Sequence, residues 1–420
     1  QRAIVRIHCT TQGLQPVQRI ARVHEIPTGP EDSFRPAVRG SILQFPLDKT
    51  LRAIFIPFPD RIHLQYHRRE QSDVPHRDRA ALHYHASART AQQEIRISKM
   101  AVLAGMAVSA HADIVLKASH QFPGGKGDVR DEMVQIIARE VEAANVGLTI
   151  KVFPGSSLVK PKEQWKAMLS GQIDMTSLPL DYASGFHPEF GATLMPGLVK
   201  SHAHARKINA SPFMDDIRSI INKGGVDVLA DAWLAGAFAG KDTCILEPKD
   251  VNGLKIRSAG ATFAEMWAGA GASIVSIPSS EVYSALQQGV AQGTDTSAGS
   301  FVSFRLYEQL KCLTAPGDQG LWFMYEPVLI SQRAMAKLND AQKAALKAAS
   351  KKAEDYFAAE SKKLDDKMVD AYTKAGVKVV YMTEAQANMW RDVAGKTSYK
   401  TFSEKVPGGK ALIDKALAVN

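Results

Sequence analysis

Residues 340–375 contain neither proline nor glycine, and this uninterrupted stretch constrains the fold more than any other feature of the sequence. Apolar and small side chains recur along it every three or four residues, which is the period of one face of a helix. Asn339 before the stretch and Gly376 after it are residues that commonly cap a helix. A helix of this length would extend about 54 Å, longer than one small domain. We therefore expect it to lie across two domains or to project from the protein.

The chain before this helix alternates between strand and helix patterns. Strands are predicted over residues 113–119, 148–155 and 173–178, with helices over 128–145 and 162–172 between them. This alternation is typical of a parallel, doubly wound sheet. A further helix over 211–224, which begins at a capping serine and a proline, and a strand over 226–230 follow.

A second, smaller α/β unit is predicted after residue 240. Its strands are expected over 243–248, 253–259 and 273–277, and its helices over 261–271 and 279–289. A strand over 377–382 and a final helical stretch complete the chain. The expected domains are residues 113–238 with about 320–350 (domain I) and 239–319 with about 376–400 (domain II), bridged by the helix over 340–375.

The positive charge of the chain is concentrated in residues 1–99. This segment contains 14 Arg and 2 Lys against 9 acidic residues, a charge of +7, whereas the remaining residues carry +2. The main body therefore has no electrostatic basis for binding nucleic acid. Two interpretations of the segment remain open. It is either a basic arm that binds an anionic partner in a cytosolic protein, or it is not part of the mature protein.

The residues that follow the basic segment have the pattern of a secretory signal. Arg96 and Lys99 precede the apolar run MAVLAGMAVS, and the small-residue pattern AHA ends it. Residues 100–112 are therefore predicted to be the apolar region and cleavage site of a signal peptide, and the mature protein is predicted to begin near Asp113. In an oxidising compartment Cys244 and Cys312 either pair or remain two buried thiols.

Motifs of catalytic chemistry are absent from the sequence after residue 112. There is no G-x-S-x-G elbow, H-E-x-x-H motif, Walker loop or dinucleotide fingerprint. The glycine-rich run 122–128 lacks the spacing of a phosphate loop, and we expect a strand-to-helix turn. His202 and His204 would not share one face of a helix. We expect no catalytic residue, cofactor or metal, which suggests a protein that binds its ligand in an interdomain cleft.

Two motifs in the second unit carry a resemblance to a known family. The run VNGLKIRSAG, followed by IPSSEVYSALQQGVAQGTD, resembles the extracytoplasmic solute receptors of tripartite ATP-independent periplasmic (TRAP) transporters, dicarboxylate-receptor type. The first motif is matched at Asp250, Gly253, Lys255, Ile256 and Arg257. The second is matched at Glu281, Tyr283, Ala285, Leu286, Gln287, Gly289 and Gly293. The likeness extends over the chain after the signal and leaves out residues 1–99.

The resemblance implies a type II-like periplasmic binding protein, in which two α/β domains joined by hinge strands and backed by a long helix close on a carboxylate. In the family, the arginine at the position of Arg257 pairs with the ligand carboxylate, to which a guanidinium offers a planar fork of donors. The resemblance further implies a periplasmic protein that delivers its ligand to TRAP membrane permease subunits. We expect a monomer and no enzymatic activity.

The sequence departs from the family pattern in ways that bear on the ligand. Gln292 replaces the usual aspartate, and Thr296 stands where the family often has asparagine. A second arginine of many members has no counterpart in the run WLAGAFAGKD before the first motif. A single cationic anchor favours a monocarboxylate over a C4-dicarboxylate.

Further candidates for the ligand site come from aromatic residues and from loops after the early strands. The aromatic candidates indicate an apolar or aromatic acid, with two or three of them at most in the pocket: Trp233, Phe238, Trp322, Phe323 and Tyr325. The loop candidates are His120, Gln121, Asp181, Tyr182 and the helix-start residue Glu163. For each of these residues, ordinary packing or a turn position is the alternative. An enzyme or lyase on a similar bilobed fold is the alternative function.

Overall fold

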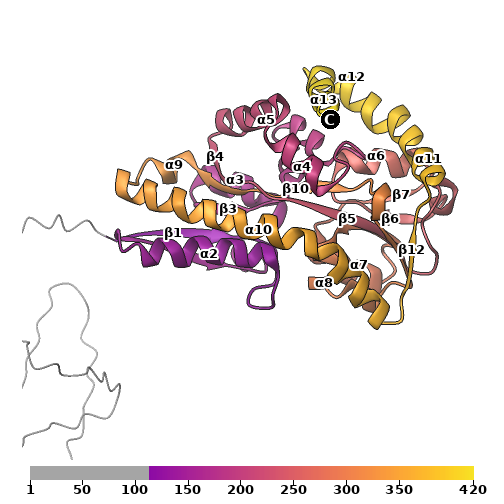
Figure 1. Cartoon of the computed structure of the whole chain (residues 1–420), viewed down its shortest axis with the longest axis horizontal. Helices are drawn as coiled ribbons and strands as arrows, with labels where there is room; N and C mark the ends of the chain where they lie inside the picture. The colour runs from indigo at the N-terminus through magenta and orange to yellow at the C-terminus, as the bar shows by residue number, and fades with distance from the viewer. Residues whose placement is uncertain (1–112) are drawn as a thin grey trace, which may run out of the picture. The chain divides into compact units, whose positions relative to one another are not determined.

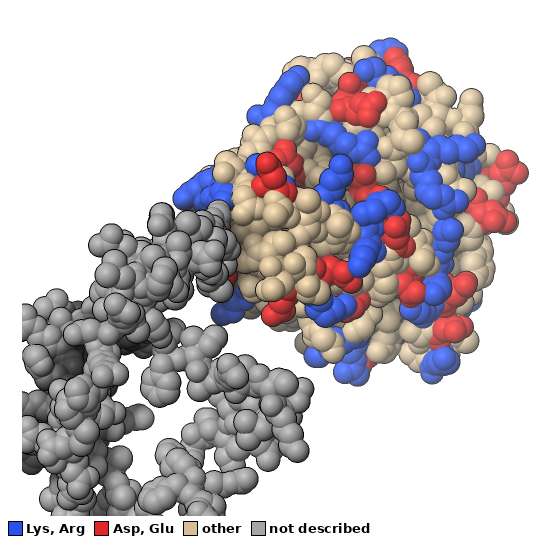
Figure 2. All heavy atoms as spheres, turned by 60° about the vertical axis from the view of Figure 1, so that its left-hand side comes forward, with Lys and Arg blue, Asp and Glu red and all other residues tan. Residues whose placement is uncertain are grey.

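The computed structural model describes residues 113–420 (Figure 1). The predictions of a basic segment over 1–99 and of a signal over 100–112 therefore lie outside the described residues. Within 113–420 the chain forms two sheets flanked by helices. No helix of this part is both long and apolar enough to cross a bilayer. Lys and Arg are interspersed with Asp and Glu on the face shown in Figure 2.

The first sheet has the strand order β2-β1-β3-β11-β4. Its strands are β1 (Ile114–Ser119), β2 (Leu148–Phe153), β3 (Met175–Ser177), β4 (Val226–Ala230) and β11 (Val328–Ser331). Its helices are α2 (Val129–Ala143), α3 (Gln164–Ser170), α4 (His202–Asn209), α5 (Pro212–Lys223) and α9 (Gln332–Met335). β1 pairs in parallel with β2 and β3 as predicted, but β11 enters antiparallel between β3 and β4 because it arrives from the other sheet. We call this sheet with its helices the first lobe.

The second sheet has the order β12-β9-β5-β8-β6-β7, and β10 pairs with β5. Its strands are β5 (Trp233–Gly240), β6 (Lys255–Arg257), β7 (Ser273–Val275), β8 (Gly293–Ser297), β9 (Cys312–Ala315), β10 (Phe323–Tyr325) and β12 (Lys378–Tyr381). Its helices are α6 (Ala261–Gly269), α7 (Val282–Gln287), α8 (Ala298–Ser303) and α11 (Glu384–Ala394). We call this sheet with its helices the second lobe.

One predicted strand of the second lobe is wrong. Residues 243–248 form no strand. Instead this segment is tied to the first residue of β9 by a disulfide between Cys244 and Cys312, with a sequence separation of 68. The Thr314 hydroxyl also donates to the carbonyl of Ile245 at 2.7 Å. The two cysteines, whose pairing the sequence leaves open, are therefore joined.

The chain passes between the lobes at two short crossings, Asp231–Ala232 from β4 to β5 and Glu326–Pro327 from β10 to β11. The crossings lie side by side, because the Glu326 amide donates to the carbonyl of Ala232 at 2.8 Å. The expected boundary after residue 238 falls inside β5, which pairs along its length with strands of the second sheet. We propose that the domains divide at these two crossings.

The long helix α10 (Asp340–Lys374) lies across both lobes, as its length predicts (Figure 1). It contacts α2 and β4 of the first lobe and α8 and β12 of the second. Asn339 caps its start in a capping box with Gln342, and Gly376 follows its end in a left-handed conformation. Its buried side includes Leu346, Phe357 and Met368.

The C-terminal helices connect the lobes once more. α11 packs on α6 of the second lobe, and after α12 (Lys400–Lys405) the last helix α13 (Gly409–Leu417) packs on α5 of the first lobe. Figure 1 shows this final segment running back from α11 to α5. The fold is thus the two-domain α/β architecture with a bridging helix that the sequence predicts.

Candidate functional site

Arg257, the last residue of β6, is fully buried between the lobes. Its Nε and Nη2 donate to the carbonyl oxygen of Ile277 at 2.9 and 2.8 Å, and its Nη1 donates to the carbonyl oxygen of Asp295 at 2.7 Å. Nη2 also donates to the Tyr182 hydroxyl at 3.2 Å. Main-chain carbonyls therefore fix the guanidinium, and the edge formed by Nη1 and Nη2 meets a residue of the first lobe.

The two lobes touch at this point through side chains that follow the carboxyl ends of their strands. The Tyr182 hydroxyl, after β3, accepts a hydrogen bond from the Ser279 amide at 2.9 Å as well as from Arg257. Lys162, after β2, donates from Nζ to the hydroxyl and carbonyl of Ser276 at 3.0 and 3.2 Å. Ligands of open α/β sheets bind outside the carboxyl ends of the strands, which is where these contacts lie.

Buried polar atoms without hydrogen-bond partners among residues 113–420 gather just after β1 and β3. Seven of the fourteen such atoms lie at or just after the ends of these two strands: Ser119 Oγ, both ring nitrogens of His120, both amide atoms of Gln121, Ser177 Oγ and Asp181 Oδ1. None of these residues exposes more than 2% of its surface. Leaving a buried polar group without a partner costs about 1–3 kcal/mol, so such groups are rare in ordinary packing. Their concentration at the edge of one sheet, beside β1 and its neighbour β3, is typical of a binding site.

His120 lies beside a carboxylate of α2. Its Nε2 lies 3.2 Å from Asp131 Oδ1, which is an ion-pair distance but lacks hydrogen-bond alignment. The ring also stacks on Phe122, with centroids 5.5 Å apart. His120 is therefore held by its surroundings while Nδ1 remains available to a ligand.

Asp181 reaches from the first lobe to the start of α6 in the second. Its Oδ2 lies so near Gly260 that a β-carbon at position 260 would be 1.5 Å from it. Burial raises the pKa of Asp181 to about 7, Asp295 adds to this effect, and Lys162 and Arg257 oppose it. The absence of a side chain at Gly260 is what allows a carboxyl group into this position.

Asp295 of β8 organises the second-lobe side of the site, and sequence reasoning missed it. Its buried carboxylate accepts from the Ser258 hydroxyl at 2.6 Å, the Trp267 indole at 2.7 Å, the Trp322 indole at 3.1 Å and the Ala259 amide at 3.2 Å. Burial raises the pKa of Asp295, and Arg257 opposes this. The sequence signal that could have identified Asp295 is its position next to Thr296, within the motif shared with the family.

Three other residues of the site, Ser119, Ser177 and Lys162, also escaped prediction. Ser119 and Ser177 end two strands that the sequence does predict. A polar residue at the carboxyl end of a buried strand is therefore a usable signal. No sequence pattern distinguishes Lys162 from a surface lysine at the start of a helix.

The aromatic candidates divide between two places. Trp322 lies in the site, where its indole holds Asp295, and Phe238 packs in the core behind it with ring centroids 4.7 Å from Trp267. Trp233 and Phe323 lie on the opposite side of β5, toward α4. There the ring of Phe323 makes an edge-on contact with the ring of His202. The structure therefore brings Trp322 and Phe238 near Arg257, but not Trp233 or Phe323.

Tyr325, Thr296 and Glu163 complete the predicted set. Tyr325 is hydrogen-bonded to Asp231 at the first crossing, away from Arg257. Thr296 is buried in β8 next to Asp295 and pairs with Ala237 of β5. Glu163 is exposed at the start of α3, next to Lys162.

The arrangement suits recognition of a small anion with polar substituents. A permanently charged guanidinium of fixed orientation lies between the lobes, while hydroxyl, imidazole and amide groups after β1 and β3 lack partners. No cluster of side chains in 113–420 is suited to hold a metal ion.

The chain matches proteins of known type. Residues 128–405 match the family model described as bacterial extracellular solute-binding protein, family 7. A solute-binding protein of Albidiferax ferrireducens is 37% identical over 302 residues, which are 71% of this chain and 89% of that protein.

Solved structures agree with this match. The structure of a TRAP periplasmic solute-binding protein from Rhodoferax ferrireducens with bound malonate is 37% identical, covers 72% of this chain and 96% of its own, and superposes with a TM-score of 0.69. A TRAP periplasmic solute-binding protein from Sulfurospirillum deleyianum with bound succinate is 23% identical, covers 74% and 100% of the two chains and has a TM-score of 0.68. At that identity the second similarity shows the fold alone.

Proposed function

The chain belongs to family 7 of the bacterial extracellular solute-binding proteins, and we propose that it binds a small monocarboxylate between its lobes and delivers it to TRAP membrane permease subunits. It is a periplasmic TRAP solute receptor for small organic acids and not an enzyme. The proposal concerns the ligand, the residues that hold it and the partner.

Arg257 is the observation that carries the proposal. Two main-chain carbonyls accept from its guanidinium, and the one side chain that it binds among residues 113–420 is Tyr182, whose hydroxyl accepts from Nη2 on the Nη1–Nη2 edge. A carboxylate is the stronger acceptor for two neighbouring N–H groups, because its two oxygens match the spacing of the guanidinium fork. We therefore place the ligand carboxylate on this edge, in exchange for the Tyr182 hydroxyl.

The groups around Arg257 favour a single carboxylate on the ligand. Asp181, whose pKa burial raises to about 7, is already a costly acid to ionise, and a second ligand carboxylate beside it would add like charge. The polar atoms of His120, Gln121 and Ser177 instead offer hydrogen bonds to a hydroxyl, carbonyl or amide. Trp322 adds an aromatic side chain beside Asp295, and Phe238 packs behind it in the core.

A short dicarboxylate is the second candidate. The relative from Rhodoferax ferrireducens, 37% identical to this chain, has malonate bound. A dicarboxylate would need a second positive partner, and Lys162 is a candidate, since it already donates to Ser276 across the lobes. Monocarboxylates and dicarboxylates therefore belong in one binding panel.

The test is calorimetric titration of the full chain with that panel, compared between wild type and Arg257→Lys. The lysine keeps the charge but loses the fork, so we expect the affinity for the best monocarboxylate to fall at least tenfold. Arg257→Ala is expected to lose about 2–5 kcal/mol, roughly 30- to 5,000-fold in Kd. A ligand at 100 times its Kd should stabilise wild type by about 2.7 kcal/mol in a thermal-shift screen.

Arg305→Lys is the matched control, because Arg305 lies in the same lobe with its side chain 67% exposed. Unfolding curves of each variant show whether it is folded before titration. If wild type and a folded Arg257→Lys bind the ligand with equal affinity, Arg257 does not bind the ligand carboxylate. Tighter binding of a dicarboxylate than of every monocarboxylate would overturn the ligand class and leave the receptor function intact.

A further inference from the structure

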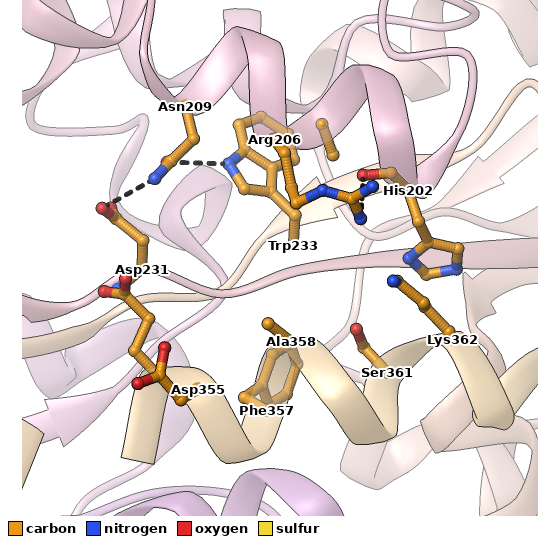
Figure 3. A pocket seen from close by; sticks show the side chains of 12 residues that line it. His202, Arg206, Asn209, Asp231, Trp233, Asp355, Phe357, Ala358, Ser361 and Lys362 are labelled. Carbon is orange, nitrogen blue, oxygen red and sulfur yellow. Dashed lines mark hydrogen bonds between the residues drawn. The ribbon is translucent and has the colours of Figure 1, made fainter. Parts of the chain in front are cut away.

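A second cavity lies outside the site described above, beside the first crossing. It has a volume of about 230 Å³ and is enclosed by α4, by Asp231 and Trp233 at the start of β5, and by α10 (Figure 3). This volume is below the range of about 300–1,000 Å³ found for sites of drug-sized ligands, so the cavity suits a small molecule.

The two ends of this cavity carry opposite charge. His202, Arg206 and Lys362 line one end, whereas Asp231, Glu354 and Asp355 line the other. Figure 3 shows Asp231 and Asp355 on its left and His202 and Lys362 on its right. Between the ends lies an apolar stretch that includes Trp233 and Phe357.

The charges at the basic end are available to a ligand. Among the described residues Arg206 pairs with no carboxylate and donates only to the carbonyl of His202 at 3.3 Å, and Lys362 forms no ion pair there. His202, in contrast, already contacts Asp365 at 3.1 Å. The carboxylate of a ligand would therefore meet two unneutralised cations, Arg206 and Lys362.

At the acidic end, Glu354 is the available group. Asp231 is engaged by Tyr325, Asn209 and Arg218, and Asp355 pairs with Lys351. Glu354 accepts through Oε2 from the Asp231 amide at 2.9 Å, which leaves Oε1 to accept from a ligand. Burial raises the pKa of Glu354, the charges of Asp231 and Asp355 add to this effect, and Lys351 opposes it.

We propose that this cavity is a second ligand site, which binds a small zwitterion with its ammonium group at Glu354 and its carboxylate at Arg206 and Lys362. The apolar stretch along Trp233 and Phe357 accommodates the methylene groups between the two charges. Because the cavity includes Asp231 at a crossing and side chains of α10, a ligand there contacts two of the elements that connect the lobes. Such a ligand would bind together with the carboxylate at Arg257, not in place of it.

The test uses unbranched ω-amino acids from 3-aminopropanoate to 6-aminohexanoate, titrated into the full chain by calorimetry. We expect one or two intermediate lengths to bind best, and pentanoate and pentylamine, which carry one charge each, to bind at least tenfold more weakly at this site. Lys362→Glu should weaken the best zwitterion at least tenfold, whereas Lys347→Glu, a charge reversal at an exposed position of the same helix, should not.

The Arg257→Lys variant separates the two sites. Zwitterion affinity that is unchanged in Arg257→Lys and lost in Lys362→Glu supports the second site. Loss in Arg257→Lys with no loss in Lys362→Glu would assign the zwitterion to the first site and overturn the inference. Failure of every chain length to bind, or equal weakening by Lys362→Glu and Lys347→Glu, would overturn it too. Failure of the second site would leave the proposed function standing, because the titrations of Arg257→Lys with the carboxylate panel test that function separately.

Discussion

At the scale of single residues, burial changes what the charged side chains of the site can do. In the sequence Arg257 ends a short strand and has no acidic neighbour. This setting does not distinguish it from an arginine exposed on the surface. In the structure it is fully buried and bound by main-chain carbonyls, which orient the guanidinium without neutralising it. The remaining positive charge, and not simply the presence of an arginine, makes this position suitable for an anion.

Asp181 gives the site a predicted pH dependence. Burial raises the pKa of Asp181 from its ordinary value of 3.8 to about 7 in the folded protein, so the folded state binds the proton more tightly than the unfolded chain. The group therefore destabilises the fold progressively as the pH rises from about 4 to 7, by up to about 1.4 kcal/mol per pH unit. We expect Asp181→Asn to gain stability over wild type at pH 8 and to match it near pH 4, measured by urea unfolding.

Asp242→Asn, a change at an exposed carboxylate, serves as the control for this measurement. It should leave the dependence of stability on pH unchanged. Parallel profiles of Asp181→Asn and wild type between pH 4 and 8 would show that Asp181 ionises normally in the folded protein.

At the scale of helices and strands, the sequence signals are strongest where an element has caps or two different faces. The helix α10 has both, and its predicted range over 340–375 differs from the observed Asp340–Lys374 by one residue. Strands β9, β10 and β11 escape prediction, since each is three or four residues long and wholly buried, whereas the equally short and buried β3 is predicted because it follows a recognisable helix that ends at Gly171. Such strands show no alternation of polar and apolar residues, and periodicity cannot distinguish them from buried loops.

The continuity of α10 can be tested with proline. Ala359 is exposed in the middle of the helix, so Ala359→Pro removes little packing but breaks a main-chain hydrogen bond and clashes with the preceding turn. We expect a loss of about 3 kcal/mol in the free energy of unfolding. Because α10 contacts both lobes, we also expect weaker ligand binding, measured by the same titrations.

Asp340→Pro is the matched control, since the first position of a helix tolerates proline and Asn339 before it is already extended. It should change stability by much less than Ala359→Pro. Equal effects of the two prolines would mean that α10 does not contribute to stability as a continuous element.

At the scale of the whole molecule, Arg130 joins the two lobes. This fully buried residue of α2 pairs with Asp128 at 2.7 Å in its own lobe, and its Nη1 donates to Ser297 and Ser300 of the second lobe at 3.0 and 2.9 Å. It also lies 3.4 Å from Glu326 at a crossing. Burial raises the pKa of Glu326 to about 7, although Arg130 opposes the effect.

We expect Arg130→Ala to lower the free energy of unfolding by about 3–5 kcal/mol, because it leaves buried carboxyl groups without their counter-charge. Arg139→Ala on the same helix removes an ion pair whose arginine is 58% exposed, and it should cost at most about 1 kcal/mol. Urea unfolding at pH 8 measures both. A loss in Arg130→Ala no larger than that in Arg139→Ala would show that Arg130 does not hold the lobes together.

The sequence by itself determines the alternation of strands and helices, the extent and caps of α10, and the family to which the motif around Arg257 points. These features depend on residues close together in the chain, so local periodicity and spacing reveal them. Only the tertiary structure decides that Cys244 pairs with Cys312, that Asp181 lies against Gly260, and that Trp233 belongs to a second cavity. Each of these depends on which distant segments meet and on how completely they exclude water, and neither property is present in any single stretch of sequence.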